Sequence, residues 1–238
     1  MIPAMEASIR TPSTPPARMI FAGRYLQFNS GRECGEERWS IEATPDALIA
    51  RGEQVLSAPH PLPSHLEYRA TLSHQWRLTG VEAAWDVGER HLRATHAAEG
   101  ELWRVRIDYA GHVKEQEGDY PAGCEMDFVT HLFSTFILQR RDFVVGGEHE
   151  FPALLIGPPY MAVTPGRVLY RCVERATRQS PLGPLSAKRY VVSRPPESES
   201  EGFTFWADDD GVVLESFEGL DVLRPWMRLV EYERGWTP

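Results

Sequence analysis

Cysteine is scarce in this 238-residue chain, and several common catalytic motifs are missing. The three cysteines, Cys34, Cys124 and Cys172, lie far apart and form no CxxC pair. This spacing suits free thiols in a reducing compartment, and the chain is long enough to need no disulfide or metal to hold its fold. There is no GxSxG, no HExxH and no glycine-rich phosphate loop. We therefore expect neither a metal nor another cofactor.

Long apolar runs and clustered positive charges are also lacking. The chain has no run of about 18 apolar residues, which a membrane-spanning helix would need. Prolines interrupt the N-terminal segment where a signal peptide would have its apolar stretch. The net charge is −9, and the basic residues are scattered along the chain. We expect a cytoplasmic protein that neither inserts into a membrane nor binds nucleic acid.

The organisation of the chain follows from its proline-rich stretches. Residues 1–18 contain TPSTPP and few large apolar side chains, which predicts a flexible arm. Later proline-rich breaks are too short to be domain linkers. Residues 19–238 are therefore predicted to form one domain.

Alternation of apolar and polar residues dominates this domain. From Leu66 to Leu78 most even-numbered residues are apolar and the odd-numbered ones are polar or charged, and a similar alternation runs from Glu101 to Tyr109. Further strands are predicted at 168–173, 187–193, 203–207, 212–217 and 226–232. The pattern predicts a mainly β protein with a curved antiparallel sheet, a half-barrel or roll.

One segment has helical periodicity instead. Apolar residues recur at three- and four-residue spacing over 125–139, with Glu125 and Asp127 in the predicted first turn and Arg140 and Arg141 at the end. We expect a helix here, packed in the concave face of the sheet. An extended segment rich in Phe and Thr is the alternative.

Two pairs of segments suggest an internal duplication. PSHLEYR at 63–69 aligns with PGRVLYR at 165–171, and the segment from Leu102 aligns with the one from Gly202, so that Gly111 pairs with Gly211. The order is the same in both halves. We predict two similar β units at about 23–118 and 143–219. Chance similarity is the alternative.

Candidate site residues fall into three groups. Arg140 and Arg141 would bind an anionic group at a cavity mouth, or else simply charge the helix end. Asp127 and His131, four residues apart on one predicted helix face, would be catalytic if the protein is an enzyme. Aromatic residues would line a cavity, with core packing as the alternative for each: Trp76, Trp85, Trp103, Tyr109, Phe133, Phe136, Tyr190 and Trp206.

The segment AGCEMDFVTHLFSTFILQRRDF at 122–143, the Tyr-Arg strand at 170 and the aromatic strand ending in DDDGVVLE together resemble the putative glycolipid-binding family. Gly123, Asp127, Phe128 and Arg140 or Arg141 match that family's turn, acid, aliphatic run and terminal arginine. The resemblance implies a two-repeat antiparallel half-barrel, related in shape to lipoprotein carriers, whose sheet wraps an apolar interior. A similar shape serves a cofactor-free enzyme of indole pigment biosynthesis.

These observations predict a cytosolic protein that binds a lipophilic or amphiphilic small molecule between the sheet and the helix. The alternative is a cofactor-independent enzyme, of isomerase, cyclase or lyase type, acting on a hydrophobic metabolite in the same cavity. A module that binds another protein through a sheet edge is a third possibility, and a homodimer is compatible with any of them.

Overall fold

The computed structural model describes residues 17–157, 161–195, 202–219 and 225–235. They form one sheet and one helix, as expected for a mainly β protein. Residues 1–16 of the predicted arm lie outside the described residues, and β1 already begins at Arg18. The strands are β1 (Arg18–Asn29), β2 (Arg32–Ala43), β3 (Leu48–Leu56), β4 (Ser64–Leu72), β5 (Leu78–Val87), β6 (Arg90–Glu99), β7 (Leu102–Tyr109), β8 (His112–Asp119), β9 (Glu125–Asp127), β10 (Glu148–Gly157), β11 (Ala162–Ser180), β12 (Gly183–Ser193), β13 (Phe203–Asp208), β14 (Val213–Glu218) and β15 (Pro225–Arg234).

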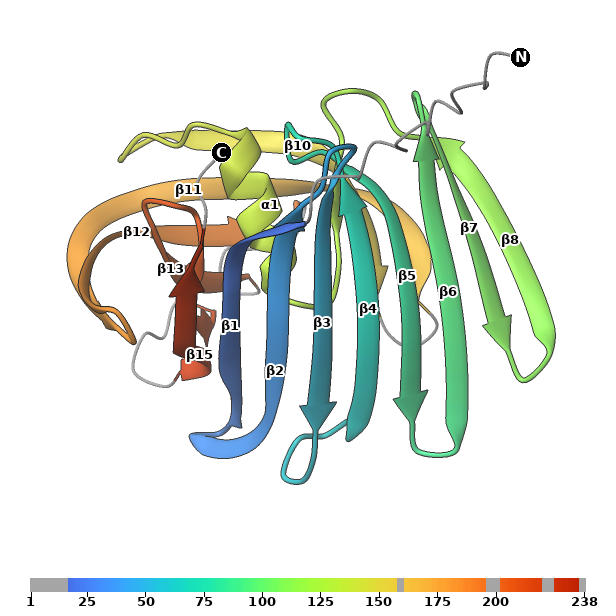
Figure 1. Cartoon of the computed structure of the whole chain (residues 1–238), viewed down its shortest axis with the longest axis horizontal. Coiled ribbons are helices and arrows are strands. Elements are labelled where there is room, and N and C mark those ends of the chain that lie inside the picture. The colour runs from blue at the N-terminus through green and yellow to red at the C-terminus, as the bar shows by residue number, and fades with distance from the viewer. Residues whose placement is uncertain (1–16, 158–160, 196–201, 220–224, 236–238) are drawn as a thin grey trace, which may run out of the picture.

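The sheet is a nearly continuous antiparallel meander. Its strand order runs from β8 back to β1, then to β15, and from β15 back to β9, so β1 and β15 join the two ends of the chain. Only the β9–β10 pair is parallel among the described strands. Figure 1 shows β1–β6 as a row of neighbouring strands, with β11 crossing behind them. The sheet curves round an interior but is not closed into a barrel, since β8 and β9 are its two edges.

Alternation along each strand separates an apolar inner face from a charged outer face. On β7, Trp103 and Val105 are buried, whereas Arg104 and Arg106 are exposed and pair with glutamates of neighbouring strands. The predicted strand at 101–109 is thereby confirmed. The predicted strand at 66–78 is wrong in its extent: it is broken by a turn at 73–77, where the Ser73 hydroxyl accepts hydrogen bonds from two backbone amides.

The helix α1 (Leu132–Arg140) begins later than the sequence predicts. Glu125 and Asp127 lie in β9, which pairs with β10, so the first helical turn has no acidic residue. The physical reason is that pairing with a neighbouring strand satisfies the backbone of 125–127, which a helical periodicity of side chains alone does not reveal.

The helix does pack in the concave face of the sheet, as predicted. The Phe133 ring is fully buried, with its centroid 5.8 Å from that of Tyr68 on β4. From the opposite wall, the hydroxyl of Tyr170 on β11 donates a hydrogen bond to the Ser134 hydroxyl over 3.3 Å. The helix is therefore held between the two walls seen in Figure 1.

The predicted duplication stays a prediction. Tyr68 on β4 and the turn at Gly111 after β7 are three strands apart, whereas Tyr170 on β11 and the turn at Gly211 after β13 are two strands apart. A superposition that matches Tyr68 with Tyr170 strand for strand therefore cannot also match Gly111 with Gly211. The difference concerns these two pairs, and a common origin of the two halves stays a prediction.

Candidate ligand cavity

A cavity of about 450 Å³ lies in the concave interior. Side chains of β1, β3, β4 and β5 form one side, and side chains of β12, β13 and β15 form the other. The segment 127–134, from the end of β9 to the first turn of α1, closes the space between them. The strand-to-helix junction that the sequence did not predict therefore builds one wall of the cavity.

Half of the apolar side chains that line the cavity are aromatic. Of these, Trp85 and Phe128 are buried, and Phe203 is half-buried. Leu62 and Trp226, which also line the cavity, are 36% and 41% exposed. The cavity is therefore open to solvent at these two residues, which is where a ligand would enter.

The polar part includes an ion pair between Asp127 and Arg194. The guanidinium of Arg194 donates to Asp127 Oδ2 over 2.9 Å, and the Asp127 side chain is only 12% exposed. Burial raises the pKa of Asp127, and the positive charge of Arg194 opposes that rise. Since the two charges offset each other, this end of the cavity carries little net charge.

His131 is the second predicted catalytic residue that lines the cavity. Its Nε2 lies 3.0 Å from the Ser216 hydroxyl, and its ring meets those of Phe203 and Trp226 edge to face. Burial lowers the pKa of His131 to about 4, so the ring is neutral near pH 7. The prediction that Asp127 and His131 share a helix face is wrong, because Asp127 ends β9, but the cavity brings both residues together.

Glu37 is the residue that the sequence reasoning missed. It lies on β2 with its side chain inward and fully buried, and Tyr68 donates a 2.7 Å hydrogen bond to its Oε1. Burial raises the pKa of Glu37 to about 7, which three polar neighbours only partly counteract. Its position in the sequence could have revealed it. Glu37, Trp39 and Ile41 are alternate residues of β2, and all three side chains point inward.

The structure places Arg140 and Arg141 away from this cavity. Both donate to the buried carboxylate of Glu125, over 2.5 and 2.9 Å, and Arg141 lies over the ring of Phe151. They fasten the end of α1 to β9. Their predicted role in anion binding stays a prediction.

The aromatic residues that the sequence predicts to line a cavity divide into one that does and seven that do not. Trp85 lines the cavity, and the other seven do not. Those seven contribute to the buried core or pack against it, and their predicted contact with a ligand stays a prediction: Trp76, Trp103, Tyr109, Phe133, Phe136, Tyr190 and Trp206.

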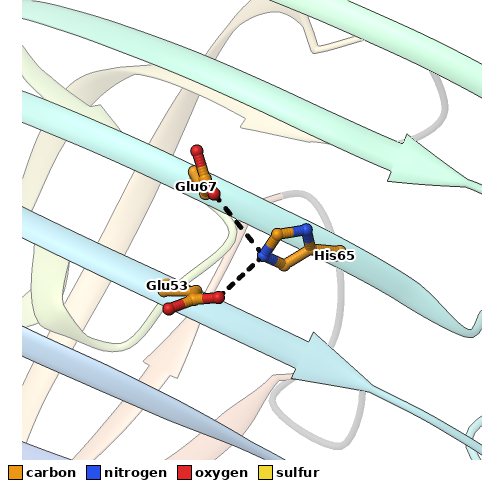
Figure 2. Close-up of side chains that lie close together, drawn as sticks. All are labelled: Glu53, His65 and Glu67. Carbon is orange, nitrogen blue, oxygen red and sulfur yellow. Dashed lines mark hydrogen bonds and ion pairs between the residues drawn. The ribbon is translucent and has the colours of Figure 1, made fainter.

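Among the described residues, one group has the donor atoms for a metal ion. His65 Nε2 lies 3.0 Å from Glu53 Oε1 and 3.8 Å from Glu67 Oε1, as Figure 2 shows for these side chains on β3 and β4. Glu53 and Glu67 face outward and are exposed. The group lies on the opposite face of the sheet from the cavity, so it cannot act on a ligand bound there.

A comparison of the sequence with known protein families identifies the family of this chain. The profile of the family described as "Putative glycolipid-binding" matches residues 29–218. The chain belongs to this family. The match begins at the last residue of β1 and ends before β15, so membership in the Putative glycolipid-binding family rests on the strands between them.

Two solved structures are similar in fold. A DUF1089 family protein from Pseudomonas aeruginosa is 16% identical, with a TM-score of 0.52 over 79% of this chain and 92% of its own. A β-barrel-like DUF1849 protein from Brucella abortus is 10% identical, with a TM-score of 0.54 over 92% of this chain and 97% of its own. No curated protein matches the chain. Within the described ranges, no helix has the length and apolar character that crossing a membrane requires.

Proposed function

We propose that this protein binds a lipophilic or amphiphilic small molecule in the interior cavity. The observation that carries the proposal is the cavity itself, in which apolar side chains, half of them aromatic, adjoin polar ones. Small-molecule sites combine apolar and polar groups, and about 450 Å³ is within their usual range. The description of the family as glycolipid-binding supports the same class of ligand.

The entrance gives the ligand a direction. Leu62 and Trp226 are the exposed apolar side chains, whereas Asp127 and His131 lie deeper and are polar. An amphiphile would place its apolar part against Trp85 and Phe128 and its polar end against the polar side chains of the wall. We also propose a cytosolic location, which the three free cysteines support.

A cofactor-independent enzyme acting in the same cavity is the second candidate. It is favoured by one observation, which is that Asp127 and a neutral His131 both line the cavity. An imidazole and a carboxyl group in one cavity are the kinds of group that general acid–base catalysis uses. Turnover of a bound ligand, followed by mass spectrometry, would distinguish this candidate from simple binding.

The binding proposal is tested by filling the cavity. Ser64 begins β4 and lines the cavity, so Ser64→Phe puts a ring into that space. Native mass spectrometry of the purified protein, and titration with decanol followed by the fluorescence of Trp85 and Trp226, would measure binding. We expect Ser64→Phe to weaken decanol binding at least about tenfold, because the ring occupies volume that the ligand needs.

The matched control is His65→Phe, which adds the same ring one residue later on the outer face. It should bind decanol as the wild type does. If both variants lose binding equally, or if the wild type binds no apolar probe, the cavity is not a ligand site.

A further inference from the structure

Three buried polar atoms behind the cavity wall have no hydrogen-bond partner among the described residues. They are the hydroxyl of Tyr25 on β1, Oε2 of Glu37 on β2 and the hydroxyl of Thr130, which precedes α1. Buried polar atoms are almost always paired, so several unpaired ones together need an explanation. Together these atoms form a group of two hydroxyls and one carboxyl oxygen that can pair with a ligand that reaches it.

The register of the sheet brings these atoms to one place. Glu37 is the cross-strand partner of Tyr25 on one side and of Gln54 on the other, and all three side chains point inward. Gln54 and Thr130 line the cavity. Glu37 does not itself line the cavity, but Gln54 and Thr130 both line it and both neighbour the Glu37 carboxyl, so a ligand would reach Glu37 past these two side chains.

The charge around Glu37 indicates what would pair with it. The side chains that face it are Tyr68, Gln54, Thr130 and Tyr25, and none of them carries a positive charge. Tyr68 already donates to Oε1, and Oε2 accepts no hydrogen bond of standard geometry, although Thr130 and Gln54 lie beside the carboxyl. The nearest cation of the cavity wall, Arg194, is held by Asp127.

We propose that Glu37 binds the polar end of the ligand, and that this end is a hydrogen-bond donor, an amine or a hydroxyl. The proposal rests on the proposed function and names the class of ligand for the same cavity. An amine is the stronger partner, because a hydrogen bond between two charged groups is roughly twice as strong as one between neutral groups. A carboxylate or phosphate would face a like charge and would leave Oε2 without a donor.

Three amphiphiles with the same chain test the proposal: decylamine, decanol and decanoate. Their affinities for the wild type and for Glu37→Gln are measured by calorimetry at pH 8, where the Glu37 carboxyl is mostly ionised. We expect the wild type to bind decylamine at least about tenfold more tightly than decanoate. Glu37→Gln should lose about tenfold in decylamine affinity and much less in decanol affinity, since the amide keeps an acceptor but not the charge.

Two further variants keep the test independent of folding defects. Glu36→Gln removes the neighbouring carboxylate, which points outward and pairs with Arg24, and it should leave all three affinities unchanged. Thr130→Val removes one of the unpaired hydroxyls next to Glu37 and leaves the carboxyl in place, and it should weaken decanol and decylamine alike by about three- to tenfold, as expected for one lost hydrogen bond.

The outcomes separate this proposal from the one it rests on. If the wild type binds all three probes equally, or if Glu37→Gln loses all of them to the same extent, the role of Glu37 is overturned and the cavity remains a ligand site. If the wild type binds none of the probes, both proposals fail.

Discussion

At the scale of single residues, Glu37 makes the stability of the protein depend on pH. Its pKa in the folded chain is about 7, above the ordinary value of 4.5, so the folded state favours the protonated carboxyl. The stabilisation is full below about pH 4.5 and is lost as the pH rises through 7. A difference of this size corresponds to about 3 kcal/mol between the two limits.

Glu37→Gln removes this dependence, because the amide does not titrate. We expect the variant to gain about 3 kcal/mol relative to the wild type on going from pH 4 to pH 8, measured by urea unfolding at each pH. The titratable groups that face Glu37 are Tyr25 and Tyr68, and burial raises the pKa of both well above that range. Parallel pH profiles for the two proteins would contradict the prediction.

The sequence could reveal that Glu37 is unusual but not what it does. Alternation along β2 places it inward, where an acidic residue is rare. Its partner Tyr68 is 31 residues away and its neighbour Thr130 is farther still, and only the register of β2, β3 and β4 brings them together. Asp127 and His131 were predicted from residue type and from their four-residue spacing on a helix; both line the cavity, but Asp127 ends β9, so the predicted helix geometry was wrong and their catalytic role stays a prediction.

At the scale of elements, α1 stabilises the interior through its aromatic face. Phe133 is fully buried and its ring meets Tyr68, Phe128 and Phe136 at centroid distances of 4.9 to 5.8 Å. Phe133→Ala should therefore lower the free energy of unfolding by about 3 to 5 kcal/mol. Val113→Ala, on the exposed edge strand β8, is the control and should change it by less than about 0.5 kcal/mol. Similar denaturation midpoints for the two variants would mean that the helix is peripheral.

The start of α1 was the weakest part of the sequence prediction, and the reason lies in the neighbouring strand. Residues 125–127 have side chains that fit a helix, but their backbone pairs with residues 153–155 of β10. Glu125, expected to face the helix dipole, is instead held by Arg140 and Arg141. Local periodicity does not contain information about a partner strand, so tertiary pairing decided the boundary.

At the scale of the whole molecule, the sequence predicted the class of fold but not how the sheet is joined. The separate alternating segments indicate strands, yet nothing in them says that β15 returns to pair with β1. Both strands lie at or beyond the ends of the family match, at residues 29 and 218. The joint between the two ends of the chain is therefore a part of this fold that neither local pattern nor family profile covers.

A buried aspartate stabilises the contact between β13 and β15 at this joint, and its removal should loosen the joint more than the rest of the sheet. Asp208, at the end of β13, accepts hydrogen bonds from the Val212 amide, from the Tyr232 hydroxyl over 3.0 Å and from Arg234 over 2.8 Å. The last two belong to β15, which pairs with β1. Asp208→Ala leaves these buried donors unpaired and should cost about 3 kcal/mol or more of unfolding free energy.

Asp210 provides the matched control, because it also pairs with Arg234 but its side chain is 41% exposed. Asp210→Ala should cost less than about 1 kcal/mol, as is usual for a surface ion pair. Hydrogen exchange would locate the difference: in Asp208→Ala the amides of β1 and β15 should exchange faster, whereas those of β5 and β6 should change less, because local opening begins where the joint is weakened. If exchange rises evenly across all strands, Asp208 supports general stability and the two ends of the chain are held together by the β1–β15 backbone pairing alone.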